Sequence, residues 1–263
     1  MMLTLPAAMR DQAISAQQKA LDSANFSRYF VSSMLAGAFV GIGGTFMLTA
    51  AGPLRAAHHP LTALVGGLVF TVGLMAVVFA GAELATSAMM TLPLGGWNHR
   101  ANWGGLSRAF GIMLLGNFVG SVIFAALVWG SQIFAKGPGR EMLFAIGEAK
   151  THLSVSAGFF RAVLCNILVC LAIWAAGRAE TEGAKIAAIV ALIGMFASSG
   201  FEHVVANMTL LPMAYMYGAP GVTLGGIAYN LAVVLVGNIV GGAIFVALPY
   251  WYLTSQQAEA AAN

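Results

Sequence analysis

The sequence predicts an all-α integral membrane protein: six transmembrane helices in an inverted 3+3 repeat, with broken second and fifth helices. Hydrophobic residues make up 59% of the chain and charged residues 8%, against about a quarter charged in soluble domains. Apolar stretches long enough to span a bilayer recur along the chain. Two carboxylates, Glu83 and Glu202, interrupt them at matching positions in the two halves. Such repeated polar interruptions mark the path of a solute.

The predicted spans lie at 29–51, 61–93, 107–134, 155–177, 184–217 and 222–253. The second and fifth spans are broken because each contains a Gly-x-Glu element, Gly81-Ala82-Glu83 or Gly200-Phe201-Glu202. Three spans per half insert the second half upside down, which brings both breaks near the midplane. The repeats cover 29–134 and 155–253 within one channel domain, 29–253. Two further matched elements, GNFVG at 116–120 and GNIVG at 237–241, have the spacing of helix-packing surfaces.

The two ends of the chain are predicted to be short cytoplasmic segments. Residues 1–28 form an amphipathic helix or tail against the membrane or the pore mouth, with Ile14, Leu21 and Phe26 as its apolar residues, and residues 254–263 form a tail. Basic residues favour both termini in the cytoplasm of a bacterial-type inner membrane. On that assignment the cytoplasmic side carries Arg10, Lys19, Arg28, Arg100, Arg108, Arg178 and Lys185, and the other side carries Arg55, Lys136, Arg140 and Lys150.

Three ionisable residues at the breaks are the leading candidates for the solute pathway. His203 lies inside a span beside Glu202, and charged groups at that depth normally face a cavity or a partner. Imidazole titrates near neutral pH, so His203 is expected to exchange a proton with the solute. Glu83 and Glu202 are expected mainly to hold the break loops in shape by accepting their free backbone N–H groups.

Further polar residues lie near the same level. Lys150 precedes the fourth span and can draw anions into an outer vestibule. Asn166 and Asn207 need partners at membrane depth, either in the pathway or in helix packing. Thr86 follows the first break and supplies a hydroxyl. The exposed N-termini of the broken helices present partial positive charge and favour anions.

Three segments in order resemble the formate/nitrite transporter family: residues 80–87 (AGAELATS), 164–174 (LCNILVCLAIW) and 199–208 (SGFEHVVANM). The resemblance covers about residues 30 to 253 and is closest in look to the nitrite channel branch. It implies an aquaporin-like helical fold, a homopentamer in the lipid bilayer with one pore per protomer, and small monovalent anions as cargo. Nitrite, formate and hydrosulfide belong to that class.

The resemblance also implies roles for individual residues. His203 is the central pore histidine, Thr86 belongs to the first break, and Lys150 and Asn166 belong to the polar set of the vestibule. The apolar constrictions match Phe70, Leu74, Leu84, Val169 and Phe196. The chain departs from the family at Ala85, where formate-type members carry Phe, so a differently shaped slit is expected.

Two alternatives remain at this point. A neutral-solute pore of the water or ammonia type also uses half-helices. Against it, the Asn-Pro-Ala repeats of water channels are missing, since no Asn-Pro dipeptide occurs, and only one histidine lies at membrane depth where ammonia channels use a pair. An intramembrane hydrolase would use Ser198 or Ser199 with His203, but such dyads place Ser and His on separate helices. No metal site, cofactor or nucleic-acid partner is expected, because ligand clusters and basic stretches with interleaved aromatics are missing.

Overall fold

The computed structural model describes residues 2–262, with side chains as far as Ser255. Every regular element among these residues is helical, and a β-bridge joins Met2 to Ala179. The elements are, in order, α1 (Leu5–Asp22), α2 (Phe26–Ala56), α3 (Thr62–Phe70), α4 (Val72–Ala76), the π-helical η1 (Val77–Gly81), α5 (Ala85–Trp97), α6 (Trp103–Gly130), α7 (Pro138–Thr151), α8 (Val155–Arg178), α9 (Glu182–Ser198), α10 (Val204–Met216), α11 (Leu224–Gly242), the π-helical η2 (Ala243–Ala247) and α12 (Leu248–Ala262).

Several of these elements are apolar enough to cross a membrane, as the composition predicts. Within residues 2–262, five helical runs meet that condition by length and hydropathy, namely α2, α3 through η1, α6, α8 and the run from α11 into α12, and α10 is a shorter apolar helix. The spans predicted at 29–51, 107–134, 155–177 and 222–253 each fall largely within one such run. The spans predicted at 61–93 and 184–217 are each divided in two, at the expected breaks.

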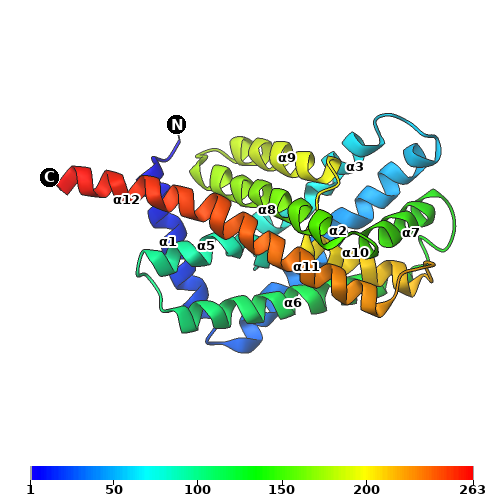
Figure 1. Ribbon diagram of the computed structural model, residues 1–263, viewed down its shortest axis with the longest axis horizontal. Coiled ribbons are helices and arrows are strands. Elements are labelled where there is room, and N and C mark those ends of the chain that lie inside the picture. Colours follow the sequence, from blue (N-terminus) through cyan, green and yellow to red (C-terminus); the bar gives the residue numbers. More distant parts are fainter. Residues whose placement is uncertain (1, 263) are drawn as a thin grey trace.

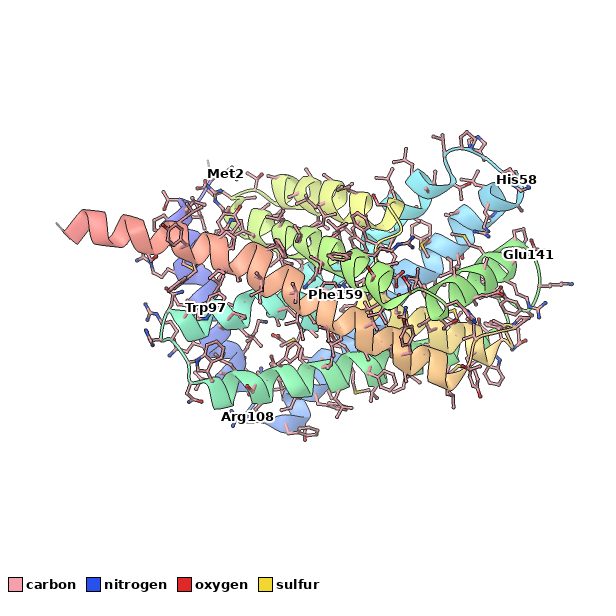
Figure 2. All side chains as sticks on the ribbon, viewed as in Figure 1. Met2, His58, Trp97, Arg108, Glu141 and Phe159 are labelled. Atoms are coloured by element: carbon pink, nitrogen blue, oxygen red, sulfur yellow. The ribbon has the colours of Figure 1, made fainter. Side chains whose placement is uncertain are left out.

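The two termini lie at the same end of the molecule (Figure 1). The turns between α5 and α6 and between α8 and α9 lie toward that end, whereas those between α2 and α3 and between α10 and α11 lie at the opposite end. Trp97 and Arg108 are accordingly far from His58 and Glu141 (Figure 2). Large apolar side chains are exposed around the helices between these ends, as a surface covered by lipid or by a neighbouring subunit requires.

α1 packs against the channel with small residues and not with the large ones that the sequence suggested. Its buried residues are Ala8, Met9, Ala13, Ala16 and Ala20, and its main contacts are with α5. Ile14, Leu21 and Phe26, expected to form the apolar face, are all exposed. The reason is the close approach of α1 to α5, where a Cβ on Gly95 would collide with Ala16.

α7 is a helix that the sequence analysis placed in a connecting loop. It begins at Pro138, whose fixed φ angle suits a first helical position, directly after Gly137 with a positive φ of 88°. Its charged last turn holds Lys150, and Met142 and Leu143 bury its inner face against α2 and α10. α7 therefore precedes the first span of the second half as α1 precedes that of the first.

Candidate functional site

Each broken span turns at a glycine in the left-handed region of backbone space. Gly81 ends η1 with φ 81°, and Gly200 follows α9 with φ 68°. Only glycine adopts such angles without strain. The chain then runs in an extended form through residues 82–84 and 201–203 before α5 and α10 begin. The Gly-x-Glu repeats are thus confirmed as the points where the two spans break.

Asn117 and Asn238 fasten the two breaks in the same way. The Asn117 side chain accepts a hydrogen bond from the Ala85 N–H (2.8 Å) and donates to the carbonyls of Glu83 and Ser33 (both 2.8 Å). The Asn238 side chain accepts from the Val204 N–H (2.9 Å) and donates to the carbonyls of Glu202 (2.9 Å) and Ala162 (2.7 Å). Both amides are fully buried. Each break is therefore held by the third long helix of its own half.

These two asparagines were assigned only a packing role by the sequence analysis. The glycines around them do pack: a Cβ on Gly120 would meet the backbone of Met34, and one on Gly241 the backbone of Val163. The asparagines add the polar function, because a buried amide between two glycines needs partners that the apolar helix cannot supply. Their matched positions in the two halves were the available signal.

The carboxylates of Glu83 and Glu202 pair with lysines, which corrects the expectation that they hold the loop N–H groups. Lys19 of α1 contacts Glu83 at 2.5 Å, and Lys150 of α7 contacts Glu202 at 2.8 Å. The Glu83 and Glu202 N–H groups instead donate to backbone carbonyls, of Ser32 and Arg161 respectively. The asparagine side chains already satisfy the amides that follow the breaks, so the carboxylates are free to bind the lysines.

The two ion pairs differ in their surroundings. The Glu202 side chain is 2% exposed and also accepts a hydrogen bond from Asn207 (2.7 Å), whose amide donates to Asn230 as well (2.8 Å). The Glu83 side chain is 20% exposed and accepts from Tyr29 (3.3 Å). The pair in the second half is thus embedded in a buried polar network.

His203 lies at the end of the second break with both ring nitrogens engaged. Nδ1 accepts a hydrogen bond from the Ala206 N–H (3.1 Å), so the ring caps α10. Because Nδ1 is an acceptor there, the proton of a neutral imidazole is on Nε2, which lies 3.0 Å from the Thr86 hydroxyl. Thr86 belongs to α5, so this contact joins the two broken segments across the molecule.

The five residues predicted to form constrictions share one buried apolar environment. Phe70, Leu74, Leu84, Val169 and Phe196 are all buried and belong to one apolar cluster. Phe196 stacks on the His203 ring with centroids 5.7 Å apart, and Phe70 meets Phe196 edge to face at 5.6 Å. The histidine is therefore enclosed by apolar side chains.

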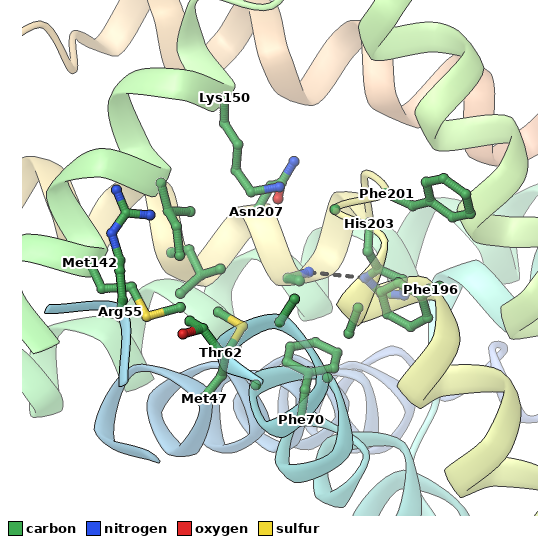
Figure 3. A pocket seen from close by; sticks show the side chains of 18 of the residues that line it. Met47, Arg55, Thr62, Phe70, Met142, Lys150, Phe196, Phe201, His203 and Asn207 are labelled. Atoms are coloured by element: carbon green, nitrogen blue, oxygen red, sulfur yellow. Dashed lines mark hydrogen bonds between the residues drawn. The ribbon is translucent and has the colours of Figure 1, made fainter. Parts of the chain in front are cut away.

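A cavity of about 400 Å³ opens beside His203 (Figure 3); we call it the His203 cavity. Its lining includes five residues that the sequence analysis predicted for the pathway or its constrictions: Phe70, Lys150, Phe196, His203 and Asn207. Arg55, at the end of α2, also lines it and was not among the predicted site residues. The remaining lining residues are mainly apolar.

Asn166, which the resemblance assigns to the polar set of the vestibule, is not among the residues that line this cavity. It is fully buried in α8, and its amide donates to the carbonyls of Thr86 (3.1 Å) and Asn238 (2.7 Å). It therefore joins α8 to α5 and α11, which is the helix-packing alternative for a polar residue at membrane depth. Ala85 is also fully buried, directly after Leu84.

The comparisons with known proteins decide the family. A sequence model described as formate/nitrite transporter matches residues 7–252. The chain belongs to the formate/nitrite transporter family. Among its relatives, the nitrite transporter NirC of Salmonella typhimurium is 39% identical over 89% of this chain and 90% of its own. The probable formate transporter of Methanothermobacter thermautotrophicus is 38% identical over 92% and 94%.

Solved structures agree with this assignment. An FNT family ion channel has a TM-score of 0.88 and 37% identity, covering 94% of this chain and 99% of its own. A pentameric formate channel with formate bound has a TM-score of 0.77 and 30% identity, covering 88% and 98%. This formate/nitrite transporter family member is accordingly a membrane transport protein and not an enzyme.

Proposed function

We propose that the protein is a channel for small monovalent anions, with nitrite or formate as the cargo and hydrosulfide as a further candidate. The observation that carries this proposal is a buried histidine, His203, placed between a cavity with basic lining residues and a cluster of apolar side chains. Apolar constrictions disfavour a bare charge, because moving a small ion into low dielectric costs many kcal/mol. A hydrogen-bond donor beside the apolar constrictions lowers the free-energy barrier to passage of the anion.

His203 is proposed to assist passage through its Nε2–H. The Nε2–H donates its hydrogen bond to the anion instead of to the Thr86 hydroxyl, so the charge of the anion is partly neutralised by this bond. A proton leaves with the anion only if Nδ1 takes up a proton from the solvent as Nε2 gives one up. Full proton exchange requires a second ring proton on Nδ1, which displaces the Ala206 N–H that Nδ1 now accepts. The cap on α10 therefore couples protonation of the ring to movement at the break.

The wider arrangement is proposed by analogy with the relatives. We infer a homopentamer with one pore per protomer, since a related formate channel of known structure is pentameric. We further infer six spans in an inverted 3+3 repeat, with 1–28 and 254–263 as cytoplasmic ends of the channel domain 29–253. The equivalent hydrogen bonds by which Asn117 and Asn238 hold the two breaks, here called the asparagine clasps, support the repeat. Bacterial transporter relatives and the basic-residue bias support an inner membrane with cytoplasmic termini.

The first test is uptake of nitrite, formate and hydrosulfide into liposomes that contain the purified protein. We expect saturable flux of at least one anion that rises as external pH falls, because protons then favour the neutral acid on the entry side. Free passage of water or ammonia with all three anions excluded would establish the neutral-solute alternative instead.

His203→Phe is the decisive variant for the proton-assisted step. The phenyl ring keeps the stack on Phe196 but supplies no proton, so pH-dependent uptake should be abolished while the oligomer remains intact. Thr86→Val keeps the shape of the side chain next to His203 but removes the hydroxyl that contacts Nε2, so it tests the contribution of that hydroxyl. Unchanged pH-dependent flux in H203F would contradict the role given to the histidine.

A further inference from the structure

The His203 cavity has an unequal distribution of charge. Lys150 is bound to Glu202 at 2.8 Å, so that pair is neutral as a whole. No Asp or Glu occurs among the residues that line the cavity. Within the described part of the chain, no ion pair or hydrogen bond involves the guanidinium of Arg55. Arg55 therefore supplies the uncompensated positive charge of this lining.

The position of Arg55 suits contact with a solute that enters from outside the cavity. It is exposed in the last turn of α2, and in Figure 3 it lies at one side of the cavity with His203 and Phe196 at the other. Lys150 and Asn207 lie between them. In the proposed topology this is the non-cytoplasmic side. The excess of basic residues that is usual on the cytoplasmic side therefore does not account for an arginine here.

The chemistry of the side chain selects among anions. A guanidinium presents parallel N–H donors in a planar fork that matches two oxygens on one centre. Formate and nitrite both have that shape, whereas hydrosulfide and chloride offer a single acceptor atom. Solvent exposure keeps this contact weak enough for the anion to move on, as conduction requires.

We propose that Arg55 is the capture residue of the His203 cavity and that it favours planar two-oxygen anions over anions with a single acceptor atom. The inference rests on the proposed anion-channel function and adds to it a specificity residue at the entrance. The anion is drawn in by the charge of Arg55, binds its fork, and passes the neutral Lys150–Glu202 pair on the way to His203.

The test compares initial uptake of formate, nitrite and hydrosulfide into neutral phosphatidylcholine liposomes at low and high ionic strength. Because the Debye length falls from about 30 Å at 0.01 M to about 3 Å at 1 M, steering by an exposed charge is lost at high salt. Arg55→Gln should lower formate and nitrite uptake about threefold to tenfold at low salt and approach the parent rate at high salt. Arg55→Lys should keep the salt dependence but reduce the preference for formate and nitrite over hydrosulfide.

Arg140→Gln is the matched control, since Arg140 lies 4.5 Å over the Phe144 ring and does not line the cavity. It should leave rates and selectivity unchanged. If R55Q matched the parent at both salt concentrations while H203F lost its flux, the capture role would be wrong and the channel proposal would stand. If the parent passed no anion, both would fall.

Discussion

At the residue scale, two buried asparagines hold the backbone of the breaks, whereas the carboxylates that are conspicuous in the sequence bind lysines. Asn117 and Asn238 each bind two backbone groups of a broken span and one carbonyl of the first long helix in the same half. A carboxylate at the break is conspicuous because it is charged in an apolar stretch. An amide flanked by glycines resembles a packing motif, and its polar role becomes clear only when the chain is folded.

Replacing either asparagine by alanine should loosen the break that it holds. In N117A the Ala85 N–H loses its acceptor, and in N238A the Val204 N–H does; each unsatisfied buried group costs about 1–3 kcal/mol. We expect both variants to lower the thermal unfolding midpoint by similar amounts and to lose most anion flux. The measurements are unfolding in detergent and liposome uptake.

Asn102→Ala is the control for this pair, because Asn102 accepts one N–H, from Gly105, at an exposed helix start. Its loss should cost about 1 kcal/mol and leave flux intact. If N238A proved as stable and as active as N102A, the clasp would have no structural importance.

At the element scale, α1 and α7 have equivalent duties in the two halves. Each precedes a long span and places one lysine against the carboxylate of the following break, Lys19 on Glu83 and Lys150 on Glu202. The long apolar helices and their breaks could be predicted from hydropathy and from the repeated Gly-x-Glu. α7 could not, because its 14 residues are too few, and its charged residues too many, for a hydropathy pattern that identifies membrane spans.

Removing the lysine should be costlier in the second half than in the first. Lys150→Met leaves the Glu202 carboxylate, 2% exposed, without its counter-ion in a buried site, which costs about 3–5 kcal/mol. In Lys19→Met the Glu83 side chain is 20% exposed and retains partial access to water, so the loss should be smaller. Unfolding midpoints in detergent compare the two.

The double variant K150M/E202Q separates charge burial from packing. It removes both charges and should recover part of the stability lost in K150M. A double variant less stable than K150M would show that the ion pair itself, and not an unpaired carboxylate, dominates the effect.

At the scale of the whole molecule, the turns and termini lie at two opposite ends, with exposed apolar side chains between them (Figures 1 and 2). The class of protein and the positions of the two breaks followed from composition and from the internal repeat. The docking of α1 through Ala16 and its small neighbours did not, because small residues carry almost no amphipathic signal. The placement of Arg55 in the lining of the His203 cavity likewise depends on how α2 ends next to α7.

Cysteine labelling should reveal which end faces the cytoplasm. Cys165 and Cys170 are buried, so they contribute little background. We expect Gln132→Cys, in the turn between α6 and α7, to react with a membrane-impermeant maleimide in intact cells. His99→Cys, in the turn between α5 and α6, should react only after permeabilisation. The reverse pattern would overturn the proposed orientation.

The asparagine clasps also impose an order on synthesis. The break after Gly81 cannot be closed until Asn117 of α6 has been made, and the break after Gly200 waits for Asn238 near the end of α11. A nascent chain that stops short of Asn238 carries unpaired backbone groups in a hydrophobic setting, where water cannot satisfy them. The last long helix, α11, therefore also supplies the side chain that holds the second break. We therefore expect the second break to take its final form only after α11 has been inserted.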